Sequence, residues 1–543
     1  CALPICRAST AREVDDETHL AHSVSALRDL WLSDREPSHS VTPACQRLAR
    51  QFPSPLIFTS NIEPSMPFTI SDILTATHGR LTQAGFSTVD ALSIETDSRQ
   101  VAGSSVFWAL PGERFDGHDF VAQAIERGAT ACVVQVGHQL EIPKGCSVIE
   151  VENSLSALVD LARWHRLRLG TPVIGITGSF GKTTTRELVS AVLSARFRVF
   201  QSPKNFNNDV GLPLCLFGLK PEHDVAVLEL GASAVGDIRR LCSVALPNYG
   251  IITGIGRAHS GSFGGVKKTR AAKAELVECL PTDGRAFLPF DDVERDFLAA
   301  KSACPVTFVS SHATDREGML TAQHITARDG MIEFNIGWQP FVFRAAGSHF
   351  VRNALFAIAV GRQLGMTDAE IAAGLARFEP VVGRCEIKKF GAWTVIDDTY
   401  NASPEAMVAA CRTLSQWPTT GRRVLVTGDM LALGEDALDG HQDVGIAAAE
   451  AGLDLVLSLG DHADAVIETA REAGMCPDRS AAFKEIEPLL NRLQSELQDG
   501  DVVLVKGSRG MRMERVVEWI AARAKSQKPI SAARRESASL ATR

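Results

Sequence analysis

The chain has 543 residues and twelve cysteines, yet no two cysteines form a Cys-x-x-Cys pair. The cysteines are scattered, which gives no sign of a paired-cysteine site. The sequence also opens without the basic, apolar and small-residue pattern of a secretory signal. These absences predict reduced thiols and a cytoplasmic location.

Long apolar runs and a basic charge excess are absent as well. No apolar stretch approaches the roughly 20 residues that a bilayer-spanning helix needs, so no integral membrane segment is expected. The formal net charge of −8 provides no basic field for nucleic acid. With 45% hydrophobic and 22% charged residues, the composition is that of an ordinary globular protein. A soluble enzyme is therefore the expected class.

The length of the chain predicts several domains. A single hydrophobic core does not extend over this many residues, and about 100 to 200 residues per domain suggests three or four, of which three fits best. Composition changes near residues 165–171 and 383–391 mark the boundaries. The predicted segments are a poorly ordered extension over 1–66, domains over 67–166, 167–384 and 385–524, and a flexible tail over 525–543.

Short apolar segments rich in β-branched residues alternate with helical patterns from Phe68 onward. This alternation predicts an α/β fold in which the strands are buried and parallel, with no run of strands alone. The expected strands are 131–134, 225–228, 249–253, 393–396, 423–427 and 502–505, and helices are expected over 354–364 and 406–414.

The stretch from Gly175 to Thr185 combines a glycine-rich turn, a lysine and a run of hydroxyls. A short apolar strand precedes it and a helical pattern follows, as in a phosphate-binding loop. Backbone N–H groups there can hold phosphate oxygens, Lys182 can reach the β- and γ-phosphates, and Thr183 can hold Mg²⁺. A nucleoside triphosphate site is predicted, although Ile176 occupies the position of the first glycine in the strict motif. An ordinary glycine-rich turn is the alternative.

Other polar residues are expected at strand ends, where ligands bind in open α/β sheets. Ser98 and Arg99 offer a hydroxyl and a guanidinium suited to a diphosphate. Asn207 and Asn208 can bind substrate oxygens, or they can simply stabilise a turn. Glu229 ends an apolar strand and is a hard oxygen ligand for Mg²⁺. Solvated turns are the alternative for the first pair.

The segment Asp397-Asp398-Thr399-Tyr400-Asn401-Ala402-Ser403-Pro404 predicts a strand, a polar elbow and a helix that starts at proline. This elbow and the Thr177–Thr185 loop resemble motifs of the Mur ligases, the ATP-dependent amide-forming enzymes of peptidoglycan precursor synthesis. Resembling segments run in family order from about residue 68 to residue 520. The resemblance implies a three-domain Mur ligase architecture: a UDP-substrate-binding domain, a central P-loop ATPase domain and a Rossmann-like C-terminal domain.

The elbow is similar to that of the family branch that adds a dipeptide, and the Asp-Asn-Pro-Arg motif of the diaminopimelate-adding branch is not found. The resemblance therefore implies that ATP and Mg²⁺ drive ligation of D-alanyl-D-alanine to UDP-N-acetylmuramoyl-tripeptide through an acyl phosphate. The expected partners are these small molecules, with no nucleic acid, and the expected state is a monomer.

The resemblance also implies roles for individual residues. Lys182, His259 and Lys273 are expected to be catalytic, with Lys273 carbamylated to give an anionic oxygen ligand. The expected metal ligands are Thr183, Glu229, His259 and Lys273. Nucleotide contacts are expected from Gly178, Ser179, Gly181, Lys182, Thr183, Thr184, Asn353, Arg384 and Asp398. Substrate contacts are expected from Ser98, Arg99, Asn207, Asn208, Tyr400 and Asn401. Phe350 stands where the family has asparagine.

Two alternatives remain at this point. The first is another ATP-dependent amide ligase on the same scaffold, such as a folylpolyglutamate or poly-amino-acid synthetase, which would have no uridine-nucleotide domain. The second is a binding protein without catalytic activity. That alternative predicts the loss of Lys182, Glu229 or Lys273, and all three residues are present.

Overall fold

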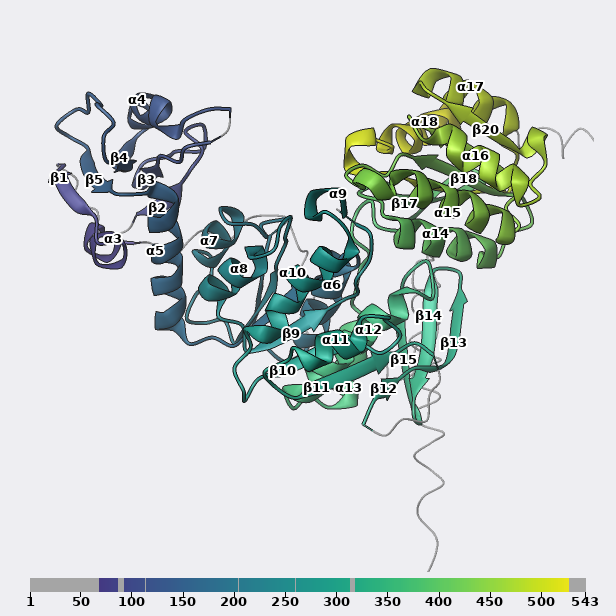
Figure 1. Cartoon of the computed structure of the whole chain (residues 1–543), viewed down its shortest axis with the longest axis horizontal. Helices are drawn as coiled ribbons and strands as arrows, with labels where there is room; N and C mark the ends of the chain where they lie inside the picture. The colour runs from purple at the N-terminus through teal and green to yellow at the C-terminus, as the bar shows by residue number, and fades with distance from the viewer. Residues whose placement is uncertain are drawn as a thin grey trace, which may run out of the picture. The chain divides into compact units, whose positions relative to one another are not determined.

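The computed structural model describes residues 68–85, 92–112, 114–203, 205–258, 260–312 and 318–526 (Figure 1). These residues form four sheets with helices between the strands. The predicted extension over 1–66, and the predicted tail beyond residue 526, lie outside the described residues. The predicted domain boundaries stay predictions.

The first sheet has five strands in the order β1-β5-β4-β3-β2, and all neighbours are parallel except β1 and β5. Its strands are β1 (Arg80–Gln83), β2 (Ser93–Glu95), β3 (Ser105–Trp108), β4 (Ala129–Gln135) and β5 (Ser147–Val151). Its helices are α3 (Ile70–Thr77), η1 (Gly117–Phe120), α4 (Val121–Glu126) and α5 (Ser154–Leu169). The nearly continuous apolar sequence of β4 fits a strand that is covered on both faces.

The second sheet is parallel throughout, in the order β12-β11-β10-β9-β6-β8-β7. Its strands are β6 (Val173–Thr177), β7 (Val199–Gln201), β8 (Val225–Glu229), β9 (Tyr249–Ile252), β10 (Arg285–Pro289), β11 (Val306–Ser310) and β12 (Leu320–Thr321). The connecting helices are α6 (Lys182–Leu193), α7 (Gly211–Leu216), α8 (Asp237–Ala245), α9 (Ser260–Phe263), α10 (Val266–Glu278) and α11 (Arg295–Ala300). Because β6, β8 and β9 are parallel neighbours, the loops that follow them meet at one edge of the sheet.

Five strands follow one another between α11 and α12 in the described residues, so the expectation of unbroken helix–strand alternation is wrong there. After β12, the strands β13 (Gln323–Arg328), β14 (Met331–Ile336) and β15 (Gln339–Arg344) form an antiparallel sheet. Gly330 and Gly337 supply the positive φ angles, +78° and +60°, that its two tight turns require. Asp329-Gly330 between alternating apolar residues was an available hairpin signal.

The fourth sheet has the order β16-β17-β21-β18-β19-β20 and is parallel except for β16. Its strands are β16 (Glu386–Phe390), β17 (Trp393–Asp398), β18 (Arg423–Gly428), β19 (Leu455–Leu459), β20 (Ser480–Phe483) and β21 (Val502–Lys506). Helices α12 (Phe350–Gln363) and α13 (Asp368–Leu375) precede this sheet, and α14 (Pro404–Gln416), α15 (Ala437–Glu450), α16 (Ala463–Glu472), α17 (Ile486–Glu496) and α18 (Glu514–Ser526) belong to it. All six strands predicted from apolar runs are confirmed, as are the two predicted helices.

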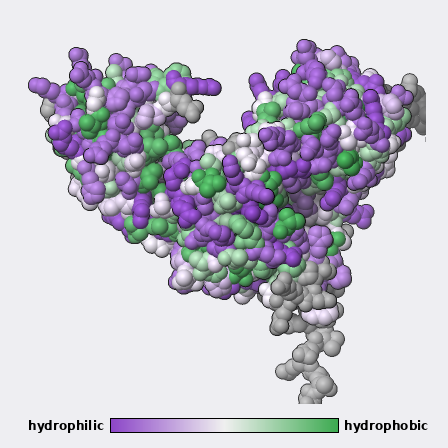
Figure 2. Space-filling view, viewed as in Figure 1, coloured by the Kyte–Doolittle hydropathy of each residue, from purple (hydrophilic) through white to green (hydrophobic). Residues whose placement is uncertain are grey.

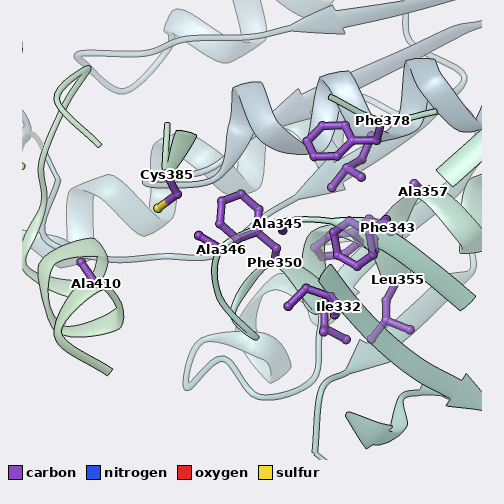
Figure 3. Packing of buried hydrophobic residues seen from close by; sticks show 14 of the residues in the cluster. Ile332, Phe343, Ala345, Ala346, Phe350, Leu355, Ala357, Phe378, Cys385 and Ala410 are labelled. Atoms are coloured by element: carbon purple, nitrogen blue, oxygen red, sulfur yellow. The ribbon is translucent and has the colours of Figure 1, made fainter. Parts of the chain in front are cut away.

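Phe350 is 6% exposed and belongs to the largest buried apolar cluster of the described residues. Figure 3 shows its ring close to Ala345 and Ala346, with Cys385 nearby. The asparagine that the resemblance predicts at this position is thus replaced by a core residue.

On the face that Figure 2 shows, apolar residues are interspersed among hydrophilic ones. In the part of the chain that the structure describes, no helix has both the length and the apolar character of a membrane span.

Candidate active site

The phosphate loop follows β6 and leads into α6. A side chain at Gly178, whose φ is +147°, would collide with the Thr253 hydroxyl. A Cβ at Gly181, whose φ is +75°, would lie 2.8 Å from the Asn353 amide nitrogen. Glycine is therefore required at both positions, and the backbone of the loop stays open to a ligand. The N-terminus of α6, which attracts anions, lies directly behind this loop.

Ser179 helps to hold the loop. Ser179 N–H donates to the Gly254 carbonyl (2.9 Å), and its hydroxyl pairs with the backbone of Gly256 (3.0 and 3.1 Å). Thr184 is buried in the first turn of α6. The loop is thereby fastened to the segment that follows β9.

Lys182 folds back over the loop, and its Nζ donates to the Gly178 carbonyl at 2.8 Å. Burial lowers the pKa of this ammonium, the nearby Glu229 carboxylate raises it, and the Arg384 charge lowers it again. A bound polyphosphate would add the negative charge that favours the ammonium form.

Glu229, the last residue of β8, is the buried carboxylate of the site, with 4% exposure. Its Oε2 accepts from the Thr183 hydroxyl (2.9 Å), and its Oε1 accepts from the Asn207 amide (3.0 Å). Arg186 Nη1 lies 3.6 Å from the same Oε2. A carboxylate beside a hydroxyl is a hard oxygen donor set, and this set fits Mg²⁺.

Asn207 and Asn208 have different contacts. Asn207 binds Glu229, whereas the Asn208 side-chain oxygen accepts from the backbone N–H of Gly211 (2.7 Å) at the start of α7. The turn-stabilising alternative therefore describes what Asn208 does in this structure.

Lys273 is 3% exposed on α10, and its Nζ lies 5.3 Å from the centre of the Phe263 ring. Burial, assisted by the charge of Lys182, lowers the pKa of its amine to about 7. A lowered pKa increases the neutral fraction of this amine, which is its nucleophilic form. Lys273 is therefore not a solvated surface lysine.

Asn353 and Arg384 reach the phosphate loop from distant parts of the sequence. Asn353 donates to the Gly181 carbonyl (3.2 Å) and to the Thr185 hydroxyl (2.8 Å). Arg384 Nη2 donates to Thr183 Oγ1 (3.0 Å), while its buried Nε has no hydrogen-bond partner among the described residues. An unused buried donor beside the loop is what a phosphate oxygen would satisfy.

The predicted elbow lies at the carboxyl end of β17. Asp398 is 9% exposed and pairs with Lys506 at 2.6 Å. The Tyr400 ring lies 4.2 Å from the Arg384 guanidinium, and Asn401 is exposed. Ser403 caps α14, whose first residue is proline as predicted.

Ser98 and Arg99 follow β2 in the first sheet. The Ser98 hydroxyl donates to Gln123 Oε1 at 2.6 Å, and Arg99 makes two hydrogen bonds to Asp97 (2.9 and 2.8 Å). These bonds lower the pKa of Asp97 to about 2. The Arg99 guanidinium is thus held in one orientation and is exposed to solvent.

A cluster of Asp116, His118 and His138 lies in the same part of the chain. His118 Nδ1 is 2.6 Å from Asp116, and His118 Nε2 accepts from the Gln135 N–H at 2.9 Å. Both ring nitrogens of His118 are therefore in use, so this histidine has no free lone pair for a metal ion.

Lys182, Thr183, Glu229, Lys273 and Arg384 are thus brought together, whereas His259 lies outside the described residues. The sequence predicts no role for Arg186, which directly follows the hydroxyl run. It also predicts none for Lys506, although Lys506 begins Lys506-Gly507-Ser508-Arg509-Gly510, a strand-end segment that resembles the family as well. A phosphate loop with a carboxylate, a buried amine and several cations at the edge of a parallel sheet defines a nucleotide-dependent enzyme.

Comparisons with known proteins agree with this class. Residues 92–165 match the model described as Mur ligase family, catalytic domain; residues 176–361 match the Mur ligase middle domain; and residues 383–509 match the Mur ligase, glutamate ligase domain. The UDP-N-acetylmuramoyl-tripeptide–D-alanyl-D-alanine ligase of Bacillus subtilis is 33% identical, covering 83% of this chain and 97% of the relative.

Solved structures give the same result. A crystal structure of MurF from Acinetobacter baumannii superposes with a TM-score of 0.76 at 30% identity, covering 84% of this chain and all of that chain. MurF ligase from Thermotoga maritima in complex with ADP superposes with a TM-score of 0.70 at 28% identity, covering 80% and 98%. The chain belongs to the Mur ligase family. Within the family, the Bacillus subtilis relative is named as a D-alanyl-D-alanine-adding ligase and the Acinetobacter baumannii structure as MurF, so the resemblance seen in the sequence and the predicted fold class are confirmed.

Proposed function

We propose that this chain uses ATP to join D-alanyl-D-alanine to UDP-N-acetylmuramoyl-tripeptide, forming ADP, phosphate and the UDP-linked pentapeptide of peptidoglycan synthesis. The observation that carries this function is the end-to-end match to a ligase of that name, over 83% of this chain and 97% of the relative. The ADP complex of a similar structure supports ATP as the nucleotide.

The match over residues 92–165 argues against the alternative of a folylpolyglutamate-type ligase, because such an enzyme would lack the uridine-nucleotide domain. The site also retains Lys182, Glu229 and Lys273 in one place, which argues against a binding protein without catalytic activity.

The first task of the site is to hold a triphosphate in line with the tripeptide carboxylate. Lys182 and the free Nε of Arg384 supply positive charge, and the phosphate loop supplies backbone donors. Transfer of the γ-phosphoryl group to the carboxylate gives the acyl phosphate and ADP. The dipeptide amine then attacks the acyl carbon and displaces phosphate, with positioning contributing roughly 7 to 11 kcal/mol of the rate enhancement.

Thr183 and Glu229 are the proposed magnesium ligands, because their oxygens lie 2.9 Å apart at the end of the phosphate loop. When bound, Mg²⁺ would offset the negative charge of the phosphates during transfer. Asn207 holds the second carboxylate oxygen and so fixes the orientation of Glu229.

Lys273 is proposed to act as its carbamate. A neutral amine attacks CO₂, forms an N–C bond and loses a proton, and this requires the lowered pKa that burial produces. The product is an anionic oxygen ligand close to Glu229. His259 is proposed to act in the same region.

The remaining assignments divide the substrates among the domains. Ser98 and Arg99 are proposed to contact the uridine-linked substrate, and Tyr400 and Asn401 the dipeptide. Asp398 and Asn353 are proposed to support the nucleotide. We further propose that the chain acts as a monomer in the cytoplasm.

The deciding experiment is phosphate release with ATP, UDP-N-acetylmuramoyl-tripeptide and D-alanyl-D-alanine, with each substrate omitted in turn. Sustained release is expected in the complete mixture alone. Phosphate release that persists when glutamate replaces the dipeptide, or when the uridine nucleotide is omitted, would favour the folylpolyglutamate-type ligase.

A further inference from the structure

Lys506, at the end of β21, is a buried lysine that the reaction outlined above does not use. It is 3% exposed and stands opposite Asp398 in the register of β17 and β21. Its Nζ donates to Asp398 Oδ2 (2.6 Å) and to the Asn401 carbonyl (2.9 Å). One ammonium therefore holds both the last residue of β17 and the elbow that follows it.

The same Asp398 carboxylate extends this connection beyond the elbow. Its other oxygen, Oδ1, accepts from the backbone N–H of Cys385 at 3.2 Å. Cys385 is the first residue after Arg384, and it has a φ of +52°, a conformation that L side chains rarely adopt. Such a conformation persists where its surroundings enforce it, and the bond to Asp398 is the contact made at Cys385 itself.

The turn that contains Cys385 determines where Arg384 points. Gly383, with a φ of +70°, accepts from Tyr400 N–H at 3.0 Å, so the turn is tied to the elbow on its other side as well. Arg384 leaves this turn to stack on Tyr400 at 4.2 Å and to donate to Thr183 Oγ1 at 3.0 Å. A continuous set of contacts thus runs from Lys506 through Asp398 and Cys385 to Arg384 and the phosphate loop.

We infer that Lys506 is a positioning residue of the ligase reaction, which acts through Asp398 and the Gly383–Cys385 turn to hold Arg384 against the phosphate loop. The inference rests on the proposed function for the identity of the reaction. The expected loss of nucleotide binding does not depend on that function. Removing the Lys506 charge frees Asp398, relaxes the strained turn and withdraws a guanidinium from the triphosphate.

A purely structural ion pair would behave differently, and the same strand offers a matched control. Arg422 Nη2 pairs with Asp501 Oδ2 at 3.0 Å at the opposite end of β21, and the Asp501 side chain is fully buried. Arg422→Met also leaves a buried carboxylate without its cation, but at the edge of the sheet away from the elbow. Because Arg422 also pairs with Glu496 at 3.2 Å, the variant reports an upper limit on the stability cost of such a break.

The test is a double-mutant cycle between Lys506 and Arg384 in the full chain. Lys506→Met, Arg384→Ala, their combination and the Arg422→Met control are compared by melting temperature, by binding of a fluorescent ATP analogue, and by kcat and KM for ATP in phosphate release. Binding of the UDP-linked substrate is measured in parallel. If the parent chain does not turn over, the proposed function fails, while the analogue-binding cycle still tests the inference.

We expect Lys506→Met to weaken analogue binding and kcat/KM for ATP by roughly 10- to 100-fold, the loss typical of a charge-assisted contact. In the Arg384→Ala background, Lys506→Met should reduce analogue binding and kcat/KM for ATP by less than about threefold, because the arginine through which Lys506 acts is already absent. The Arg422→Met control should lose melting temperature without that kinetic loss, and UDP-substrate binding should not change.

Equal losses from Lys506→Met in the two backgrounds would overturn the inference, as would a Lys506→Met chain with parental nucleotide affinity. Should Lys506→Met not fold, Lys506→Arg takes its place in the cycle. It keeps the charge while displacing the donor atoms, and a smaller loss that again disappears without Arg384 is expected. A loss that survives in the Arg384→Ala background would again overturn the inference.

Discussion

At the scale of single residues, Lys182 is the cation of the phosphate loop that is expected to matter for activity rather than for stability. Its ammonium contacts a loop carbonyl rather than the core. Lys182→Ala should therefore reduce phosphate release by about 100-fold or more while leaving the melting temperature nearly unchanged. An alanine at the exposed Lys389 of β16 serves as the control. Turnover near that of the parent chain would show that the loop does not bind the transferred phosphate.

Lys273 has the opposite character, since it is buried and its role depends on chemistry that the sequence does not display. Lys273→Ala should be inactive, and short-chain carboxylates should restore part of the activity, because the missing group would be an anionic oxygen ligand. Activity is measured by phosphate release with acetate or with ethylamine at equal concentration. Rescue by the amine instead would mean that the ammonium itself is needed.

The pKa of Lys273 also predicts a pH dependence of stability. In the folded chain the pKa is about 7, against an ordinary value of 10.5. Between these two values the unfolded chain binds more protons, so the free energy of unfolding rises with pH across that window. Lys273→Met deletes this dependence. The melting temperature of Lys273→Met minus that of the parent chain, measured in CO₂-free buffer, should be highest near pH 7 and should fall toward pH 9. A constant difference would contradict the lowered pKa.

At the scale of elements, the elbow after β17 separates backbone from side-chain roles. The Asn401 carbonyl accepts from Lys506, while its side chain is exposed and free to meet a ligand. Asn401→Ala keeps the carbonyl and should weaken dipeptide use by about 1 to 3 kcal/mol in apparent transition-state binding. The measurements are kcat/KM for D-alanyl-D-alanine and the dissociation constant of the UDP-linked substrate. A change confined to the second quantity would assign the elbow to the other substrate.

At the scale of the whole molecule, the proposed function divides the substrates among separate sheets. Arg99 lies after β2 in the five-stranded sheet, and Asp97 holds its guanidinium in place. Arg99→Ala should raise the dissociation constant of the UDP-linked substrate roughly tenfold or more and leave ATP-analogue binding unchanged, because it removes one charge-assisted contact. Parallel titrations of the two ligands check this. Weakened analogue binding alone would refute the division.

Contiguous stretches of sequence carried much of the prediction. Three features lie within short stretches of this kind: the phosphate loop, the strand that ends in Glu229 and the Asp398–Pro404 elbow. The turns and helix starts in them require glycine, proline or a hydroxyl at particular positions, so the sequence reveals them. The antiparallel strands β13 to β15 were missed although their turns are just as local. Asp329-Gly330 predicts the first of these turns, whereas the helix–strand alternation on either side of the segment does not continue through it.

The sequence by itself thus determined the family motifs, the parallel strands and the residues at their carboxyl ends. The tertiary structure decided which of those residues meet. Thr183 and Glu229 are 46 residues apart, Asp398 and Lys506 are 108 apart, and Gly181 and Asn353 are 172 apart. No local pattern encodes such pairs, because they depend on strand order and on which side chains lose water when the sheets are covered. The same burial gives Lys273 its low pKa and Arg384 its unused donor, and neither property exists before the chain folds.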